Sequence, residues 1–358
     1  MQSEHIKMEN TFIISGGKTG RIEWLDVLRG MAMYLVVIGH ATDINTPDNY
    51  RFYIYAFHMP LFFMISGAAY YLQMRARSFD FIALVKNKAK GLLWPYLTLN
   101  FITFWIWILN FKILSHSEST LAEKIYAIIY SNEEYIESPS NATWFLPTLF
   151  LTILVFYLVQ KWSEGEEKLL TLAVLVLGVA GYVCSQDPDA VDLPWHIGTV
   201  PIALIMFLVG YLVLKHIGRL EHFLESAKRQ GVIFIVSVLV GYLCARSNTK
   251  ISMSSNEYGS LILFMMAALC FSLAFMLLAV WVPKFRILKF IGRNTIVYLA
   301  FHAPLFRFIE VVSERTRGIF ERHPVIVASL VFVGLIPVAY IFEKYLGGLL
   351  GRKSKKAS

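Results

Sequence analysis

Residues 21–41 read Arg21-Ile-Glu-Trp-Leu-Asp26-Val-Leu-Arg29-Gly-Met-Ala-Met-Tyr-Leu-Val-Val-Ile-Gly-His40-Ala41. This run is apolar enough to enter a membrane, yet it carries an acid, a base and an imidazole. Ionisable groups are costly inside a bilayer and are usually retained for function. At 3.6 residues per turn, Asp26, Arg29 and His40 share one face of a helix, with His40 about 16 Å beyond Arg29 along the axis. This face must contact protein or water rather than lipid.

The composition points to a membrane protein. The chain has 358 residues, of which 56% are hydrophobic and only 16% are charged. That is too apolar for an ordinary soluble domain, and apolar runs of about 17 to 25 residues, the length of a transmembrane helix, recur along it. We predict an all-α, polytopic membrane helical bundle with ten spans, at residues 24–42, 51–73, 91–112, 143–160, 169–184, 197–214, 231–246, 258–281, 288–309 and 324–346.

The distribution of basic residues supports this count. If the N-terminus is cytoplasmic, the segments assigned to the inside hold 22 Lys and Arg residues and those assigned to the outside hold 8. Because cytoplasmic loops are enriched in these residues, we expect ten spans with both termini in the cytoplasm. The net charge of +8 then follows from topology, and we expect no nucleic-acid partner. The expected parts are a cytoplasmic segment 1–22, a transmembrane domain 23–346 and a basic cytoplasmic tail 347–358.

Three histidines fall at similar depth in this topology. His40 lies toward the outer end of the first span, His58 about two turns below the outer end of the second, and His302 in the middle or outer half of the ninth. Trp144 opens the fourth span at the outer face. Intramembrane histidines at one depth, with aromatic residues nearby, predict an outward-facing polar cavity.

Each of these residues also has a structural interpretation. A buried histidine can simply bond a backbone carbonyl of a neighbouring helix. Asp26 and Arg29 can form an ion pair that fixes a helix contact, and Trp144 can belong to an interfacial aromatic belt. No two histidines share an i, i+4 spacing, so the sequence predicts no metal site.

Four stretches, taken in order, resemble the acyltransferase 3 family. They are Arg29-x10-His40, Phe57-His58-Met-Pro60-Leu-Phe-Phe-Met-Ile-Ser-Gly67, Trp144-Phe-Leu-Pro147 and Ile291-Gly-Arg-Asn-Thr-Ile-Val-Tyr-Leu-Ala-Phe-His302-Ala-Pro304. The resemblance covers residues 21–346. Members of this family are membrane-embedded, mostly bacterial acyltransferases that O-acetylate envelope glycans and similar hydroxyl compounds, and the resemblance implies the same activity here. It also implies that His40 is the catalytic histidine and that Arg29 is its partner.

The chain departs from the family's pattern in the basic segment before the third span. Family members tend to carry Arg-x-x-Arg there, whereas this chain has Lys86-Asn-Lys88-Ala-Lys90-Gly91. Lys88 matches the first arginine and Gly91 stands at the second. Lysine lacks the bidentate fork of arginine, but Lys86, Lys88 and Lys90 would still attract the phosphates of a donor acyl-CoA at the cytoplasmic face.

These residues suggest a mechanism. Acetyl-CoA, or another acyl-CoA, would be the donor substrate, with no bound cofactor, and a hydroxyl of a carbohydrate would be the acceptor. His40 would act as general base or transiently take the acyl group, while Asp26 would hold Arg29. Either His58 or His302 could assist, and the sequence does not choose. We expect a multi-pass protein of the bacterial plasma membrane, in contact with its lipids.

Two other functions fit the same residues. Intramembrane charges also mark the pathway of a transporter of a glycan or small polar solute, although the chain shows no paired inverted repeat. A non-catalytic subunit that retains the fold is the second alternative, because fold does not guarantee function.

Overall fold

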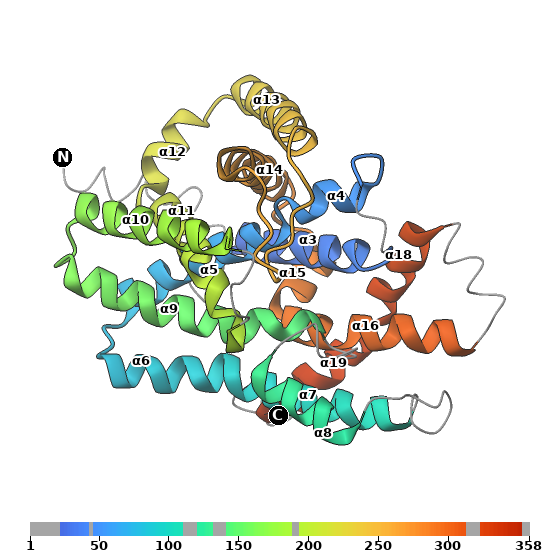
Figure 1. Cartoon of the computed structure of the whole chain (residues 1–358). Coiled ribbons are helices and arrows are strands. Elements are labelled where there is room, and N and C mark those ends of the chain that lie inside the picture. The colour runs from blue at the N-terminus through green and yellow to red at the C-terminus, as the bar shows by residue number, and fades with distance from the viewer. Residues whose placement is uncertain are drawn as a thin grey trace.

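The computed structural model describes residues 22–42, 46–109, 120–131, 141–187, 193–312 and 323–352. Within these ranges the secondary structure is helical, apart from one isolated bridge between Ser252 and Glu257. The helices gather into a single bundle (Figure 1). The expected N-terminal segment 1–22 lies outside the described residues except for Ile22.

Among the described residues, seven helical stretches are long and apolar enough to cross a membrane. They are Tyr50–Ala76, Ala142–Trp162, Glu167–Ser185, Pro194–Lys215, Ala227–Arg246, Leu261–Trp281 and Pro324–Lys344. Each overlaps one expected span, so an all-α membrane bundle is confirmed. The other three expected spans, 24–42, 91–112 and 288–309, are also helical but shorter or interrupted. The number ten and the cytoplasmic position of the termini therefore stay predictions.

Helix α3 (Glu23–Gly39) occupies the centre of the bundle (Figure 1). It packs against α5 (His58–Ala76), α14 (Leu261–Trp281), α15 (Arg286–Arg293) and α16 (Thr295–Val312). Most of its residues are buried, Asp26 among them. Because protein surrounds α3, its charged side chains face other helices rather than lipid, as their spacing predicts. We call the end of the bundle where α3 begins the base and the end where it finishes the top.

Two glycines allow α3 and α15 to pack backbone to backbone. A Cβ on Gly292 would lie 1.8 Å from the carbonyl oxygen of Asp26, and a Cβ on Gly30 would lie 2.3 Å from that of Leu288. No side chain fits at such distances, and small residues are what let membrane helices approach this closely. The contact fixes the position of Asp26 against the end of α15.

Three expected spans are interrupted helices. The second consists of α4 (Tyr50–Tyr55) and α5, and the tenth of α18 (Pro324–Gly334) and α19 (Ile336–Lys344). The ninth breaks at Asn294, between α15 and α16, where the backbone adopts φ −117° and ψ 20°. The first of these breaks comes directly before His58 and that of the ninth span directly after Arg293.

The basic segment before the third expected span is mostly helical. Asp80 caps α6 (Phe81–Lys88) by accepting a hydrogen bond from the backbone of Ala83. A π-helical segment, η1 (Ala89–Leu93), then leads without a break into α7 (Trp94–Trp107). Single π-helical turns are frequent at functional sites. The expected donor lysines therefore project from a continuous helix.

The tail expected from residue 347 begins as a folded turn. The 3-10 segment η5 (Gly347–Leu350) packs on α7, where the Trp94 indole donates to the Gly348 carbonyl at 3.0 Å and the Thr98 hydroxyl donates to the Leu349 carbonyl at 2.7 Å. Residues from 353 onward lie outside the described part of the chain.

The remaining helices complete the bundle. They are α8 (Leu121–Tyr130), η3 (Asn141–Trp144), α9 (Phe145–Trp162), α10 (Glu167–Ser185), η4 (Pro194–Thr199), α11 (Val200–Lys215), α12 (Ile217–Phe223) and α13 (Ala227–Arg246). Helix α13 lies at the edge of the bundle (Figure 1) and buries few residues, as expected of a helix that faces lipid.

Candidate functional site

A pair of histidines lies at the top of α3. The helix ends at Gly39, and His40 is its C-cap residue. The half-buried ring of His40 packs against the fully buried ring of His302 from α16, with 5.0 Å between centroids and 58° between planes. The structure thus places His302, rather than His58, in ring contact with His40.

The hydrogen bond of His302 defines which ring nitrogen carries the proton in the neutral side chain. Its Nδ1 lies 2.8 Å from the carbonyl oxygen of Tyr298. Because a carbonyl can only accept, Nδ1 must carry the proton and Nε2 must hold the lone pair. Nε2 is buried and has no hydrogen-bond partner among the described residues. Buried polar atoms are nearly always bonded, so this atom marks a position for a reacting group or an ordered water.

His58 contacts His40 indirectly. Its Nδ1 donates to the carbonyl of Ile54 at 2.8 Å, which fixes the same tautomer as in His302. Its ring lies 4.8 Å from that of Tyr55, and Tyr55 lies 6.3 Å from His40. Both His58 and His302 therefore bond carbonyls four residues earlier in their own segment, and not carbonyls of a neighbouring helix.

Arg51 belongs to the top of the site, although the sequence analysis assigns it no role. It donates through Nη1 to the carbonyl of Thr42 and through Nη2 to the Tyr55 hydroxyl at 2.9 Å. Its guanidinium also lies 4.6 Å above the Tyr55 ring. Arg51 therefore ties the segment after His40 to helix α4. The available signal was its position at the start of an apolar span, one helical turn before Tyr55.

A second cluster lies at the base of α3. The carboxylate of Asp26 is 1% exposed and accepts hydrogen bonds from Arg29 Nη1 at 3.2 Å and from Arg293 Nε at 3.0 Å. The expected contact between Asp26 and Arg29 is present. Arg293 is an additional partner, and its only sequence signal was its place in the Ile291–Pro304 motif. One buried carboxylate is therefore shared by two guanidiniums.

Asn294, the residue after Arg293, forms hydrogen bonds that link three segments next to this cluster. It is fully buried and donates to the carbonyl of Phe290 at 3.0 Å and to the Glu343 carboxylate at 2.9 Å. Arg352 donates to the Asn294 side chain at 3.0 Å and to the Arg293 carbonyl at 2.6 Å. The break between α15 and α16 is therefore held by α19 and by the C-terminal turn.

A cavity of about 220 Å³ lies between the two clusters. Arg29 is the one charged residue in its lining, at the base. Near the top, its lining includes Met59, which follows His58, and Leu299, which lies one helical turn before His302. The cavity therefore extends from Arg29 toward the histidines. Its lining residues are Arg29, Met33, Met59, Phe62, Ile65, Ser66, Leu92, Phe145, Leu146, Leu149, Thr295, Ile296 and Leu299.

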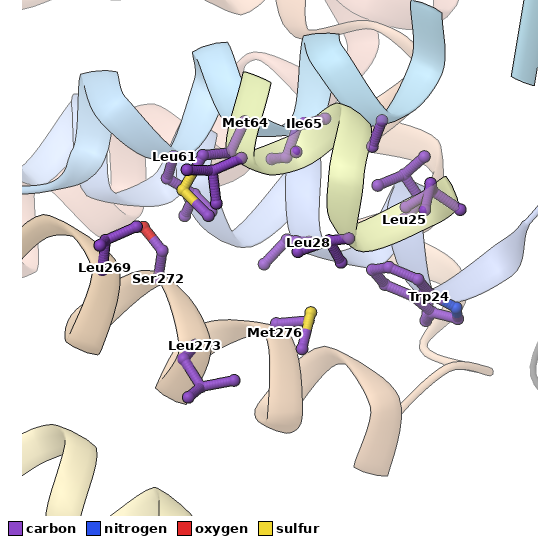
Figure 2. Close-up of a pocket in the computed structure, with 15 residues that line it drawn as sticks. Trp24, Leu25, Leu28, Leu61, Met64, Ile65, Leu269, Ser272, Leu273 and Met276 are labelled. Atoms are coloured by element: carbon purple, nitrogen blue, oxygen red, sulfur yellow. The ribbon is translucent and has the colours of Figure 1, made fainter. Parts of the chain in front are cut away.

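A second cavity of similar volume lies on a neighbouring face of α3. Figure 2 shows Leu61 and Met64 of α5 on one side, Leu273 and Met276 of α14 on the other, and Leu28 of α3 between them. Its lining contains no charged residue, and it shares only Ile65 with the first cavity. Because this space is almost wholly apolar, it suits hydrocarbon rather than polar chemistry.

Trp144 lies beside the first cavity rather than in its lining. Its ring packs against His196 at 4.9 Å and against Phe145, which does line the cavity, at 6.5 Å. His196 and Trp195 adopt positive φ values of 51° and 58°. Such backbone conformations are uncommon for residues other than glycine and tend to occur at functional sites.

The three expected donor lysines differ in environment. Lys86 and Lys90 are exposed, whereas Lys88 is partly buried and donates to the side chain of Gln73 on α5. Burial lowers the pKa of the Lys88 ammonium to about 8. Across the described residues, no group of three or more His, Cys, Asp or Glu side chains could hold a metal ion.

Comparison with known proteins gave one finding. A model of the acyltransferase 3 family, described as an acyltransferase domain, matches residues 22–344. The searches of curated proteins and of solved structures returned no match. The matched range includes both clusters and the cavity, and it ends before Arg352.

Proposed function

Since this chain belongs to the acyltransferase 3 family and is a membrane acyltransferase, we propose that it transfers an acetyl group from cytoplasmic acetyl-CoA to a hydroxyl of an envelope or exported glycan. The base of the bundle would face the cytoplasm and the top would face the acceptor. The membrane would be the bacterial plasma membrane.

The cavity between Arg29 and the histidines carries this proposal. A transfer across the membrane requires a donor thioester to reach the catalytic group from one side and an acceptor hydroxyl to reach it from the other. The cavity begins at a guanidinium, passes between apolar side chains and ends within one turn of His58 and His302. This arrangement suits a donor with an anionic end and a less polar arm that carries the acyl group.

His40 would supply the general base. It takes the proton from the acceptor hydroxyl as the oxygen attacks the thioester carbonyl, and the coenzyme A thiolate leaves as the carbon–sulfur bond breaks. The proton then passes to that thiolate. General acid–base catalysis of this kind contributes about 10²- to 10⁴-fold in rate. His302, in ring contact with His40, would help to stabilise the positive charge that His40 acquires.

Arg29 and the basic residues near the base would bind the donor. Arg29 contacts the cavity directly, and Asp26 fixes its side chain. Lys86, Lys88 and Lys90 would attract the donor phosphates by charge-assisted hydrogen bonds. Trp144, which lies beside the cavity, would help to bind the acceptor.

The test is acetyl transfer by membranes that contain the protein. We expect His40→Ala to abolish transfer of labelled acetyl groups from acetyl-CoA to cell-envelope glycans, while the protein reaches the membrane at the normal level. His222→Ala is the matched control, because His222 is exposed and pairs with Glu225 at the surface. Mass spectrometry of the glycans would identify the acceptor by the mass of one acetyl group.

Two outcomes would contradict the proposal. Full acetylation by the His40→Ala variant would remove His40 from the mechanism. Wild-type membranes that consume no acetyl-CoA, but move a glycan or small polar solute, would establish the transporter instead.

A further inference from the structure

Arg293 presents donor groups that the protein itself does not use. Its Nε donates to Asp26, but its two Nη amines have no hydrogen-bond acceptor among the described residues. The side chain is 41% exposed, whereas its partner Asp26 is 1% exposed. One edge of the guanidinium is therefore fixed and the other is open to a ligand.

Arg352 brings a second guanidinium to the same place. Its hydrogen bonds to the Arg293 carbonyl and the Asn294 side chain attach it directly to the end of α15. The preceding residue, Gly351, has φ 67°, and a Cβ there would lie 2.0 Å from the carbonyl oxygen of Lys90. Only glycine fits this position. The C-terminal turn thus lies between α15 and the basic segment η1.

Among the described residues, arginines outnumber carboxylates around this point. Asp26 is shared by Arg29 and Arg293, and Glu343 accepts its hydrogen bond from the neutral Asn294. By contrast, Lys289 on α15 is neutralised by Glu23 at 3.1 Å. Among the described residues in this network, three guanidiniums, those of Arg29, Arg293 and Arg352, thus accompany two carboxylates, those of Asp26 and Glu343.

We propose that Arg293 and Arg352 form an anion site that binds the diphosphate portion of the nucleotide donor. Arg293 would contact a phosphate with its open Nη edge, since the planar guanidinium matches phosphate geometry. Arg352 holds Arg293 in place and adds positive charge. The rest of the donor would continue past Asp26 and Arg29 into the cavity. This inference rests on the proposed use of an acyl-CoA donor.

The site can be tested by direct binding. Coenzyme A would be titrated into the full-length purified protein in lipid nanodiscs, with the heat of binding as the readout. We expect Arg293→Gln to raise the Kd for coenzyme A about tenfold or more, the usual effect of losing a charge-assisted hydrogen bond. We expect Arg352→Gln also to raise this Kd, because Arg293 loses its support and the site loses a positive charge. Arg219→Gln is the control, because Arg219 is an exposed arginine on α12 with no assigned role.

A phosphate-free thioester separates the anion site from the chemistry. S-acetyl-pantetheine lacks the diphosphate, so Arg352→Gln should use it at the wild-type rate while its KM for acetyl-CoA rises. Loss of activity with both donors would overturn the assignment, because it would indicate damage to the fold. If Arg293→Gln does not fold, Arg352→Gln decides the question, since its guanidinium lies at the surface.

Failure of the site and failure of the proposed function give different results. If the wild type and both variants bind coenzyme A equally, the anion site is wrong and the acyl-CoA donor still stands. If the wild type binds no coenzyme A, the proposed acyl-CoA donor is wrong, and the proposed anion site is wrong as well.

Discussion

At the scale of single residues, the chemistry depends on which histidine nitrogen is available. His58 and His302 each commit Nδ1 to a backbone carbonyl, so each ring offers Nε2 as its basic atom. His302 alone of these two packs on His40. The ring of His302 lies directly against that of His40, so it can stabilise His40 when this general base becomes charged in a poorly hydrated site.

Replacing His302 tests this contact. We expect His302→Gln to lower kcat by about 10- to 100-fold, which is less than the full effect of a general acid–base group because His302 acts through His40, and to leave the KM for acetyl-CoA nearly unchanged. The measurement is the initial rate of acetyl transfer, normalised to the amount of protein in the membrane. His58→Gln is the comparison, because its ring reaches His40 through Tyr55, and a larger loss in that variant would contradict the role of His302.

Lys88 gives a prediction about pH. Burial lowers its pKa to about 8 from 10.5, so it becomes neutral as the pH rises above about 8. If Lys88 binds donor phosphate, the Kd for coenzyme A should rise between pH 7 and pH 9 in the wild type. Lys88→Met should bind more weakly at pH 7 and lose this dependence, whereas Lys90→Met should retain it. An unchanged pH profile in Lys88→Met would exclude Lys88 from the donor site.

The same shift has the opposite effect on stability. Because the folded pKa lies below the ordinary value, the unfolded chain binds more protons between about pH 8 and 10.5. Lys88 therefore makes the free energy of unfolding rise with pH across this interval, while donor binding weakens. If coenzyme A binding weakens as the pH rises while the free energy of unfolding does not fall, the cause is loss of the ligand contact and not loss of the fold.

Sequence spacing predicted the residues of one helix well and the contacts between helices poorly. Asp26 and Arg29 are one turn apart, so their pairing follows from helix geometry alone. Arg293 lies 267 residues from Asp26, and nothing in the spacing indicates that α15 packs on α3. The contacts of Arg352 could not be predicted either, because its partners belong to a helix break that the apolar pattern does not reveal.

At the scale of elements, the breaks in the helices place the polar groups. Hydropathy averages over a whole span, so the expected spans 51–73 and 288–309 looked continuous. The structure divides the first before His58 and the second at Asn294. Such a break leaves backbone groups to be satisfied by side chains or by the chain that lines a cavity. At the second break Asn294 donates to the carbonyl of Phe290 and Arg352 donates to that of Arg293.

The close contact of α3 with α15 can be tested by one methyl group. In Gly292→Ala the new Cβ would lie 1.8 Å from the Asp26 carbonyl oxygen, so the two helices must separate. We expect the free energy of unfolding to fall by about 1–3 kcal/mol, as in other overpacked interfaces. Acetyl transfer should also fall, because the contact of Asp26 with Arg293 would lengthen.

Thermal unfolding in nanodiscs, alongside transfer rates, provides the measurement. Gly218→Ala is the control, because a Cβ there meets nothing within 4 Å. A Gly292→Ala protein as stable and active as the control would show that the α3–α15 contact does not position the base cluster.

At the scale of the whole molecule, the central position of α3 explains how costly charges are accommodated. The helix has charged groups at its base and an imidazole at its top, and it is surrounded by α5, α14, α15 and α16. Composition and apolar periodicity predicted the membrane bundle, and ordered motifs predicted the family that matches residues 22–344. The cavity could not be predicted, because its walls come from helices far apart in the sequence.

The arginine pair beside the cavity has a consequence for turnover. A site that holds the donor by its phosphates makes the same contacts with the product, because coenzyme A keeps those phosphates after the acyl group has left. Phosphate contacts that do not change between substrate and transition state lower KM without raising kcat, and they also bind the product. Spent coenzyme A would then compete with fresh donor, and the rate of glycan acetylation would follow the cytoplasmic ratio of acetylated to free coenzyme A.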